Sequence, residues 1–365
     1  MAVLISGCTV SKTNRIKGDN NLKPENIMNI MHKVADWQIA KLQSPEKASN
    51  DWTYATLYAG LFDFGKLSKD KKYVRFLYNV GQELDWNTGK IRFHADEYCI
   101  GQTYCELYEI YHEPNIIGKF HALADSIVAK PHIESLEFKN NINSREWAWC
   151  DALFMGPPAL AYLSTATHDP KYLETADKLW WKTTDYLFDT TEGLYYRDSR
   201  YFTKREANGQ KVFWSRGNGW VMGGLVRMMI NMPANYPNKQ KFEALFKIMA
   251  KRIASLQTSD GTWHASLLAP ELYPSKETSG TGFYCYALAW GIRNGLLPYK
   301  EYFPIVKKSW DVLVASVHPD GKLGFVQQIE DKPGDVKYDD TQVYGVGAFL
   351  LAGTQLFLLL NDIKN

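Results

Sequence analysis

The chain has 365 residues, of which 45% are hydrophobic and 22% charged, an ordinary balance for a globular protein with ample core material. Its formal net charge is only +2, and its lysines and arginines are scattered along the sequence. Nucleic-acid-binding proteins normally carry a basic face, so we expect no nucleic-acid partner. The 12 tryptophans and 22 tyrosines fit either a large helical core or stacking against sugar rings.

The amino-terminal segment, residues 1–24, has the features of a processed export signal. Leu4-Ile5-Ser6-Gly7-Cys8 resembles a bacterial lipobox, in which the cysteine is lipidated, and the polar residues after it would form a tether. This predicts a periplasmic or outer-membrane lipoprotein whose only membrane contact is the lipid on Cys8. The alternative is a chance match and a cytoplasmic protein. We find no later apolar stretch of about 20 residues that would span a bilayer.

From residue 25 onward, helical periodicity recurs and strand signals are sparse. No boundary rich in Pro, Gly or Ser divides this part, so residues 25–365 are predicted to form a single catalytic domain. Asp51 and the Asp169-Pro170 pair are helix-start signals. The predicted helices are 25–43, 51–67, 69–85, 98–112, 114–130, 147–167, 170–187, 217–232, 238–257, 279–296, 300–316 and 341–361.

Alternate helices differ in character. The second predicted helix and every other one after it are rich in Gly, Ala and aromatic residues and nearly free of charge, as in Gly219-Trp220-Val221-Met222-Gly223-Gly224. A helix that is apolar all round is buried, whereas the intervening amphipathic helices face solvent. Six such hairpins predict an all-α (α/α)6 barrel, a six-hairpin toroid. An open solenoid is less favoured, because small residues permit close approach at a crowded centre.

Two acidic residues precede or open inner helices, where side chains would converge at the barrel mouth. Asp151 lies between Trp149 and Phe154, and an apolar setting raises the pKa of a carboxyl so that it can act as a general acid. Alternatively, Asp151 caps its helix or pairs with a buried arginine such as Arg216. Asp96 is a candidate partner carboxylate or a helix cap.

Three further residues are candidate substrate contacts. Arg216 is suited to holding a substrate carboxylate while Trp214 stacks on a sugar ring, although Arg216 equally suits neutralising a nearby aspartate. His264 is either a substrate contact or a histidine of a surface loop. The histidines form no HxH or HExxH pattern and the five cysteines no CxxC, so we expect no metal site.

Two motifs carry a family resemblance. Trp149-Cys150-Asp151-Ala152-Leu153-Phe154-Met155, followed by Pro157, and Phe213-Trp214-Ser215-Arg216-Gly217-Asn218-Gly219-Trp220 resemble glycoside hydrolase family 105. These are unsaturated rhamnogalacturonyl hydrolases, related to the unsaturated glucuronyl hydrolases of family 88. The likeness extends over about residues 25–361. It implies an (α/α)6 barrel, no cofactor and removal of a 4,5-unsaturated uronic acid from the non-reducing end of lyase-generated oligosaccharides of pectin or rhamnogalacturonan type.

The resemblance also implies roles for individual residues. Asp151 matches the general acid/base and Asp96 its partner carboxylate, while Trp214, Arg216 and Trp149 match substrate contacts. Arg197, at a position where some relatives carry histidine, is a further candidate contact. The implied chemistry is protonation of the enol ether at C4 and hydration at C5. The alternatives are a polysaccharide lyase or sugar epimerase on the same barrel, and a non-catalytic surface glycan-binding lipoprotein.

Overall fold

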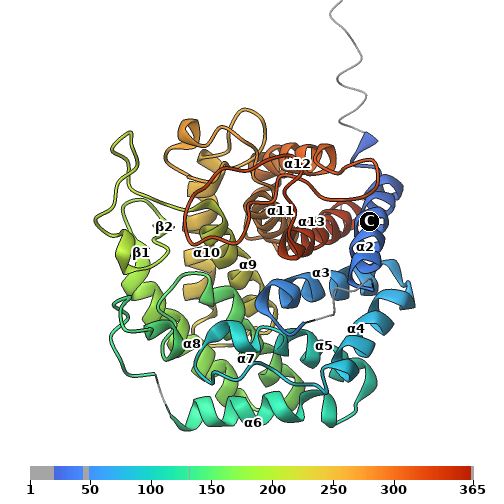
Figure 1. The fold of residues 1–365 in the computed structure, drawn as a ribbon, viewed down its shortest axis with the longest axis vertical. Helices are drawn as coiled ribbons and strands as arrows, with labels where there is room; N and C mark the ends of the chain where they lie inside the picture. Colours follow the sequence, from blue (N-terminus) through green and yellow to red (C-terminus); the bar gives the residue numbers. More distant parts are fainter. Residues whose placement is uncertain (1–19, 44–48, 131, 363–365) are drawn as a thin grey trace, which may run out of the picture.

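The structure is a computed structural model that describes residues 20–43, 49–130 and 132–362. The predicted lipobox and Cys8 lie outside these residues. The α-helices within them (Figure 1) are α2 (Pro24–Leu42), α3 (Trp52–Ser68), α4 (Lys71–Glu83), α5 (Gly101–Tyr111), α6 (Asn115–Ala129), α7 (Ala152–Thr167), α8 (Pro170–Leu187), α9 (Ser215–Ile230), α10 (Lys239–Ser255), α11 (Thr278–Arg293), α12 (Tyr299–Ala315) and α13 (Val343–Asp362). Every predicted helix is present, and the start of α7 is shifted most.

Short elements lie in the connections. The strands β1 (Phe188–Asp189) and β2 (Leu194–Tyr195) pair antiparallel after α8. Four 3-10 turns occur in the described residues: η1 (Ala95–Tyr98), η2 (Ile142–Ser144), η3 (Ser199–Tyr201) and η4 (Pro270–Leu272). These elements were not predicted, because two- and three-residue segments are too short to show a period.

The inner helices form a closed ring. Helix α3 packs against α5, α5 against α7, α7 against α9, α9 against α11 and α11 against α13, and α13 returns to α3. The helices α2, α4, α6, α8, α10 and α12 surround this ring, each packed on an inner neighbour (Figure 1). The predicted all-α (α/α)6 barrel is confirmed, and the open solenoid is wrong because α13 packs on α3.

Glycines allow the ring to close. Where α3 meets α13, a Cβ on Gly60 would lie 2.4 Å from the carbonyl oxygen of Gly347, and a Cβ on Gly347 would lie 2.3 Å from the carbonyl oxygen of Thr56. Below the mouth, the barrel axis is filled by aromatic rings, with Trp220 and Phe283 centred 4.5 Å apart. The barrel is therefore a packed core and not a channel.

Helix α13 corrects one expectation. By length and composition it is apolar enough to cross a membrane, contrary to our sequence estimate, yet 78% of its apolar window is buried inside the protein. Its mean hydropathy follows from its place in the inner ring, where a helix is covered on all sides. We interpret it as a core helix.

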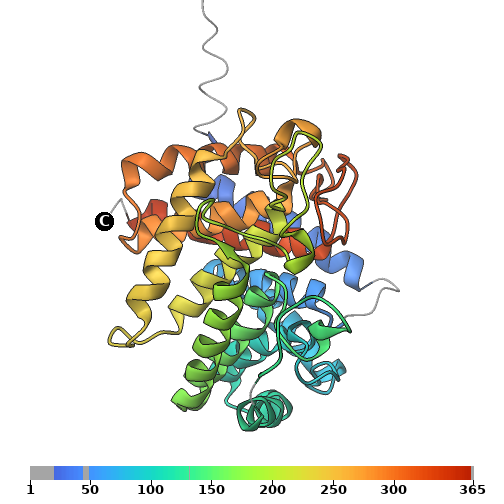
Figure 2. The same cartoon turned by 90° about the vertical axis from the view of Figure 1, so that its left-hand side faces the viewer.

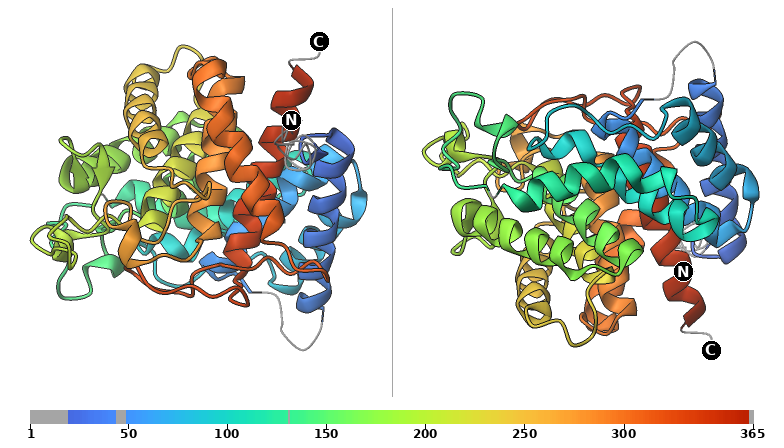
Figure 3. Two further views of the ribbon diagram at one scale, coloured as in Figure 1. Left: turned by 90° about the horizontal axis from the view of Figure 1, so that it is seen from above. Right: turned by 90° about the horizontal axis from the view of Figure 1, so that it is seen from below.

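The two ends of the ring differ. Figures 2 and 3 show the long segment that precedes α13 on one face of the molecule and the carboxyl end of α13 at the opposite face. Toward the second end, fully buried Arg227 donates to Glu106 at 3.2 Å and to Gln102, and it lies 3.8 Å from Asp63. Burial raises the pKa of Glu106 to about 7. The first end, where the inner helices begin, is the mouth.

We predict that Gly347→Ala lowers the free energy of unfolding by about 1–3 kcal/mol, because the added methyl group forces α3 and α13 apart. The control is Gly118→Ala on the exposed side of α6, where a Cβ meets nothing within 4 Å. That change should be stabilising by about 0.5–1 kcal/mol through helix propensity. Urea denaturation of both variants measures the difference, and equal stabilities would contradict tight packing at Gly347.

Candidate active site

The inner helices bring three carboxyl groups to the mouth. Asp51 is the N-cap of α3 and accepts a hydrogen bond from the Thr53 amide at 2.9 Å. Asp96 lies in η1, ahead of α5, and Asp151 precedes the first residue of α7. Neither Asp96 nor Asp151 makes a helix-capping hydrogen bond, since the N-cap of α5 is Ile100 and the Asp151 side chain caps no amide. The structure therefore does not support the helix-cap alternatives for these two residues.

Asp96 and Asp151 are electrostatically coupled. Burial, and then the charge of Asp151, raises the pKa of Asp96 to about 8, against the opposing effect of Arg197. Burial also raises the pKa of Asp151, while the guanidinium groups of Arg197 and Arg216 oppose this rise. Two coupled carboxyls share their protons, so near neutral pH the pair holds one proton. The ion pair with Arg197 favours the ionised form of Asp151, and therefore favours Asp96 as the group that holds this proton.

Arg197 is the cation beside Asp151. Its Nε lies 3.5 Å from Asp151 Oδ2, and its Nη1 donates to Asp198 Oδ2 at 2.8 Å. Asp198 is fully buried and also accepts from Arg200, so it holds the Arg197 side chain in place. Arg197 Nε is buried without a hydrogen-bond partner within the described residues. The predicted buried arginine next to Asp151 is thus Arg197, which forms an ion pair with it.

His94 and Trp149 line the other side of Asp96. His94 Nδ1 lies 3.7 Å from Asp96 Oδ2, and the ring of His94 is centred 5.1 Å from that of buried Trp149. Asn143 Nδ2 lies 3.3 Å from His94 Nε2 and donates to it, which places the imidazole proton on Nδ1, facing Asp96. Burial lowers the pKa of His94, so the ring is neutral at pH 7. Trp149 lies at the site as predicted, and its contact with substrate stays a prediction.

Sequence reasoning missed His94 and Asp198 as site residues. Both were visible as neighbours of predicted ones, since His94 precedes Asp96 by two positions and Asp198 directly follows Arg197. An acidic residue that directly follows one arginine and precedes a second, Arg200, by two positions is a signal for a held cation.

Arg216 has a different setting from the predicted one. It is fully buried, and its terminal N–H groups donate to the carbonyl oxygens of Gln327 at 2.9 Å, Gln328 at 3.0 Å and Glu330 at 3.3 Å. Its guanidinium therefore holds residues 327–330 at the mouth. A substrate contact through these N–H groups requires that segment to move, and such a contact stays a prediction.

Trp214 takes part in the same arrangement. Its ring lies 4.5 Å from the Arg216 guanidinium, its Nε1 donates to Gln327 Oε1 at 2.8 Å, and only 2% of the residue is exposed. In this conformation the ring faces Arg216 and is not open to a sugar. We expected Trp214 to stack on a sugar ring, but the Trp214 and Arg216 side chains together fill the wall next to α13, so the Trp214 ring is buried.

His264 lies in the loop before α11. Its Nδ1 is 3.0 Å from the carbonyl oxygen of Pro270, and its Nε2 is 3.2 Å from Asp260 Oδ2. Both ring nitrogens are therefore engaged within its own loop, as in the surface-loop alternative. The predicted substrate contact remains untested. Among the described residues, no group of three or more His, Cys, Asp or Glu side chains is placed to hold a metal ion.

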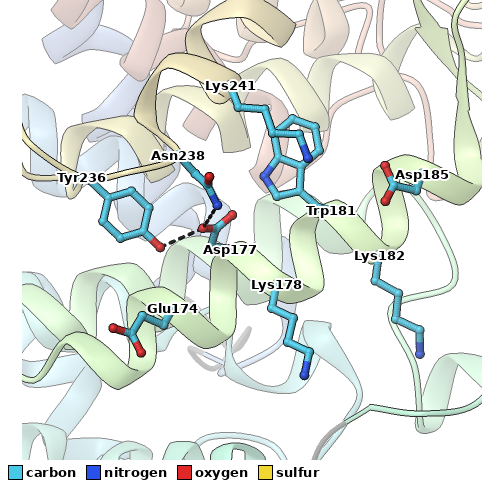
Figure 4. Close-up of a pocket in the computed structure, with 9 residues that line it drawn as sticks. All are labelled: Glu174, Asp177, Lys178, Trp181, Lys182, Asp185, Tyr236, Asn238 and Lys241. Atoms are coloured by element: carbon cyan, nitrogen blue, oxygen red, sulfur yellow. Dashed lines mark hydrogen bonds between the residues drawn. The ribbon is translucent and has the colours of Figure 1, made fainter.

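Two cavities differ in their relation to the mouth. A cleft of about 800 Å³ lies between α2 and the starts of α3 and α13. A second, of about 470 Å³, lies on the outer wall along α8 (Figure 4). There Asp177 accepts hydrogen bonds from Tyr236 and Asn238, and the Lys241 ammonium lies 3.5 Å from the Trp181 ring. This outer pocket has its carboxylate occupied and its indole covered, which disfavours it as a sugar site.

An (α/α)6 barrel with coupled carboxyls at its mouth defines the class of six-hairpin glycosidases. The chain belongs to Glycosyl Hydrolase Family 88, whose sequence model matches residues 28–360. It is therefore a glycoside hydrolase that acts on unsaturated uronyl oligosaccharides, which confirms the family resemblance and rules out the non-catalytic alternative.

Curated relatives cover nearly the whole chain. An unsaturated 3S-rhamnoglycuronyl hydrolase of Formosa agariphila is 37% identical over 98% of this chain and 97% of its own length. A protein of the same name from Alteromonas sp. (strain LOR) is 36% identical, over 90% of this chain and 85% of its own. Neither these relatives nor the family match supports the predicted lipid anchor at Cys8, and the cellular location stays a prediction.

Solved structures share the fold. A family 88 glycosyl hydrolase from Bacteroides vulgatus has a TM-score of 0.84 at 28% identity, covering 92% of this chain and 99% of its own. A structure described as a polysaccharide lyase has a TM-score of 0.85 at 29% identity, covering 93% and 98%. A family 105 glycoside hydrolase of C. acetobutylicum, at 22% identity and a TM-score of 0.73 over 89% and 98%, shows the fold alone.

We predict that Asp96→Asn stabilises the protein, and increasingly so as the pH rises from about 4 to 8. A raised pKa means that the folded state keeps a proton that the unfolded chain, with a pKa of 3.8, releases. Wild-type stability therefore falls across this window, and the asparagine variant lacks that loss. Thermal unfolding at pH 4, 6 and 8.5 measures it.

The control for that comparison is Asp185→Asn, which removes an exposed carboxylate on α8 that does not contribute to the raised pKa of Asp96. Its difference in Tm from wild type should vary little with pH. A pH-independent difference for Asp96→Asn would contradict the raised pKa.

Proposed function

We propose that this chain removes a 4,5-unsaturated uronic acid from the non-reducing end of a lyase-generated oligosaccharide, at a linkage to a rhamnose-type sugar as in rhamnogalacturonan fragments. The observation that carries the proposal is the coupled pair Asp96 and Asp151, with Arg197 beside it. The substrate named for the relatives at 37% and 36% identity supports the same class of sugar linkage here.

Substrate binding moves the shared proton to Asp151. The uronate carboxylate binds the Arg197 guanidinium in competition with Asp151, so the positive charge that opposes the raised pKa of Asp151 is neutralised. The negative charge of the substrate raises the pKa of Asp151 further. The proton then passes from Asp96 to Asp151, which becomes the general acid of the bound complex.

The chemistry is hydration of an enol ether. Asp151 donates its proton to C4, and positive charge develops at C5, where the ring oxygen shares it and the two carboxylates stabilise it. A water attacks C5 and returns its proton to Asp151. The hemiketal opens to a ketone at C5 and leaves a hemiacetal at C1, and this hemiacetal collapses to an aldehyde as it releases the neighbouring sugar. This differs from ordinary glycosidases, in which two carboxylates act at the anomeric carbon.

We predict that Asp151→Asn lowers kcat by about 10²–10⁴-fold, because the amide cannot donate this proton. The loss of the unsaturated chromophore of a lyase-generated oligosaccharide is the measurement. The control is Asp185→Asn, an exposed carboxylate on α8, which should keep full activity. Near-normal turnover by Asp151→Asn would remove Asp151 from the role of acid.

The same chromophore distinguishes the proposed hydrolase from the lyase alternative, which the description of one similar structure favours. A lyase creates the unsaturated chromophore from intact polymer, whereas the proposed hydrolase consumes it from oligomers. Chromophore gain on intact pectic polymer, without loss on oligomers, would replace the proposal by a lyase.

We predict that kcat/KM falls as the pH rises through about 8, where the free enzyme loses the shared proton. Since Arg197 lowers the pKa of both carboxyls, Arg197→Gln should move this alkaline limb to higher pH and raise KM. Asp198 keeps Arg200 as its partner in this variant. A pH–rate profile of both proteins tests this, and an unshifted limb would show that Arg197 does not tune the pair.

A further inference from the structure

We propose that the cleft between α2 and the starts of α3 and α13 binds the sugar on the reducing side of the cleaved bond, and that Lys41 selects leaving sugars that carry an anionic group, a sulfate ester or a carboxylate. This rests on the proposed function, because it assigns the leaving-group side of the same site.

The cleft has the size and position of a sugar subsite. Its volume of about 800 Å³ lies within the range of ligand-binding pockets. Its walls come from α2, the first turn of α3, and the segment that leads into α13, and they include Trp37, Lys41, Asp51, Tyr54, Ile329 and Thr341.

The cleft lies at the same end of the ring as the carboxyl pair. Asp51 forms part of its wall, and the Asp51 charge is near enough to Asp96 to contribute to its raised pKa. Asp51, Asp96 and Asp151 all lie at the starts of neighbouring inner helices, at one end of the ring. We infer that an oligosaccharide whose terminal uronyl group binds at Asp151 and Arg197 directs its next sugar toward this cleft.

The lining matches a sugar with a charged substituent. Trp37 and Tyr54 supply aromatic surface for the C–H faces of a ring. Thr341 Oγ1 is buried with no hydrogen-bond partner in the described part of the chain, so it is available to a sugar hydroxyl.

Lys41 supplies the charge. Its ammonium group lies 5.4 Å from the Trp37 ring, and no carboxylate of the described residues lies within 4.0 Å of it. The Asp51 carboxylate is instead bonded to the Thr53 amide and hydroxyl. An unpaired ammonium beside an indole favours an anion on the sugar that fills the cleft, as Arg197 favours the uronate at the other end.

Lys41→Gln tests the assignment with three disaccharides that share the unsaturated uronyl group and carry neutral rhamnose, rhamnose sulfate or galacturonate as the leaving sugar. For at least one anionic substrate, KM should rise about 5-fold with kcat unchanged, the size expected for a solvent-exposed charge contact. KM for the neutral substrate should stay constant. The anionic substrate that responds identifies the group as sulfate or carboxylate.

Two variants sharpen the test. Lys41→Glu should raise KM for the responding anionic substrate beyond the glutamine variant, because it adds repulsion. Lys33→Gln, an exposed lysine of the same helix outside the cleft lining, is the matched control and should behave as wild type. Equal changes for neutral and anionic substrates, or no change for any, would overturn the role of Lys41. A wild-type protein that consumes none of the three would instead refute the proposed function.

Discussion

The site depends on how closely the backbones of the inner helices can pack against one another in the ring. Six inner helices converge closely enough only where side chains are absent, as at Gly60 and Gly347 between α3 and α13. The space that remains on the axis is filled by indole and phenyl groups such as Trp220 and Phe283. This apolar floor excludes water from the base of the mouth. A carboxyl at the mouth is therefore harder to ionise, and its pKa is raised.

The helices were predictable because the hydrophobic residues of each recur with a helical period that can be recognised in one sequence. Inner and outer helices separate by charge content, and the closed ring follows from the small residues of the inner ones. Asp151 was recognisable between Trp149 and Phe154 for the same reason, since local apolar neighbours imply a raised pKa. Features that depend only on the periodicity of a segment, or on its immediate sequence neighbours, could therefore be predicted from the sequence.

The partners of these residues were not predictable, because they come from distant segments. Arg216 meets carbonyl groups more than 100 positions away, at Gln327 and Gln328. Its sequence context, next to Trp214, is that of a carboxylate clamp, but irregular backbone near the mouth needs donors and a buried guanidinium supplies them. Residues 327–330 then contribute Ile329 to the cleft wall. Arg216 thus helps to shape the wall of the cleft.

Charge balance explains how an acidic mouth accepts an acidic substrate. Asp51, Asp96 and Asp151 would together repel a uronate if all were ionised. Coupling removes one of these charges, because the pair keeps a proton up to about pH 8. Arg197, held by Asp198, offsets a second. In the proposed mechanism, the proton used for catalysis is therefore also the proton that allows the substrate to bind, so binding and acid catalysis should weaken together as the pair ionises.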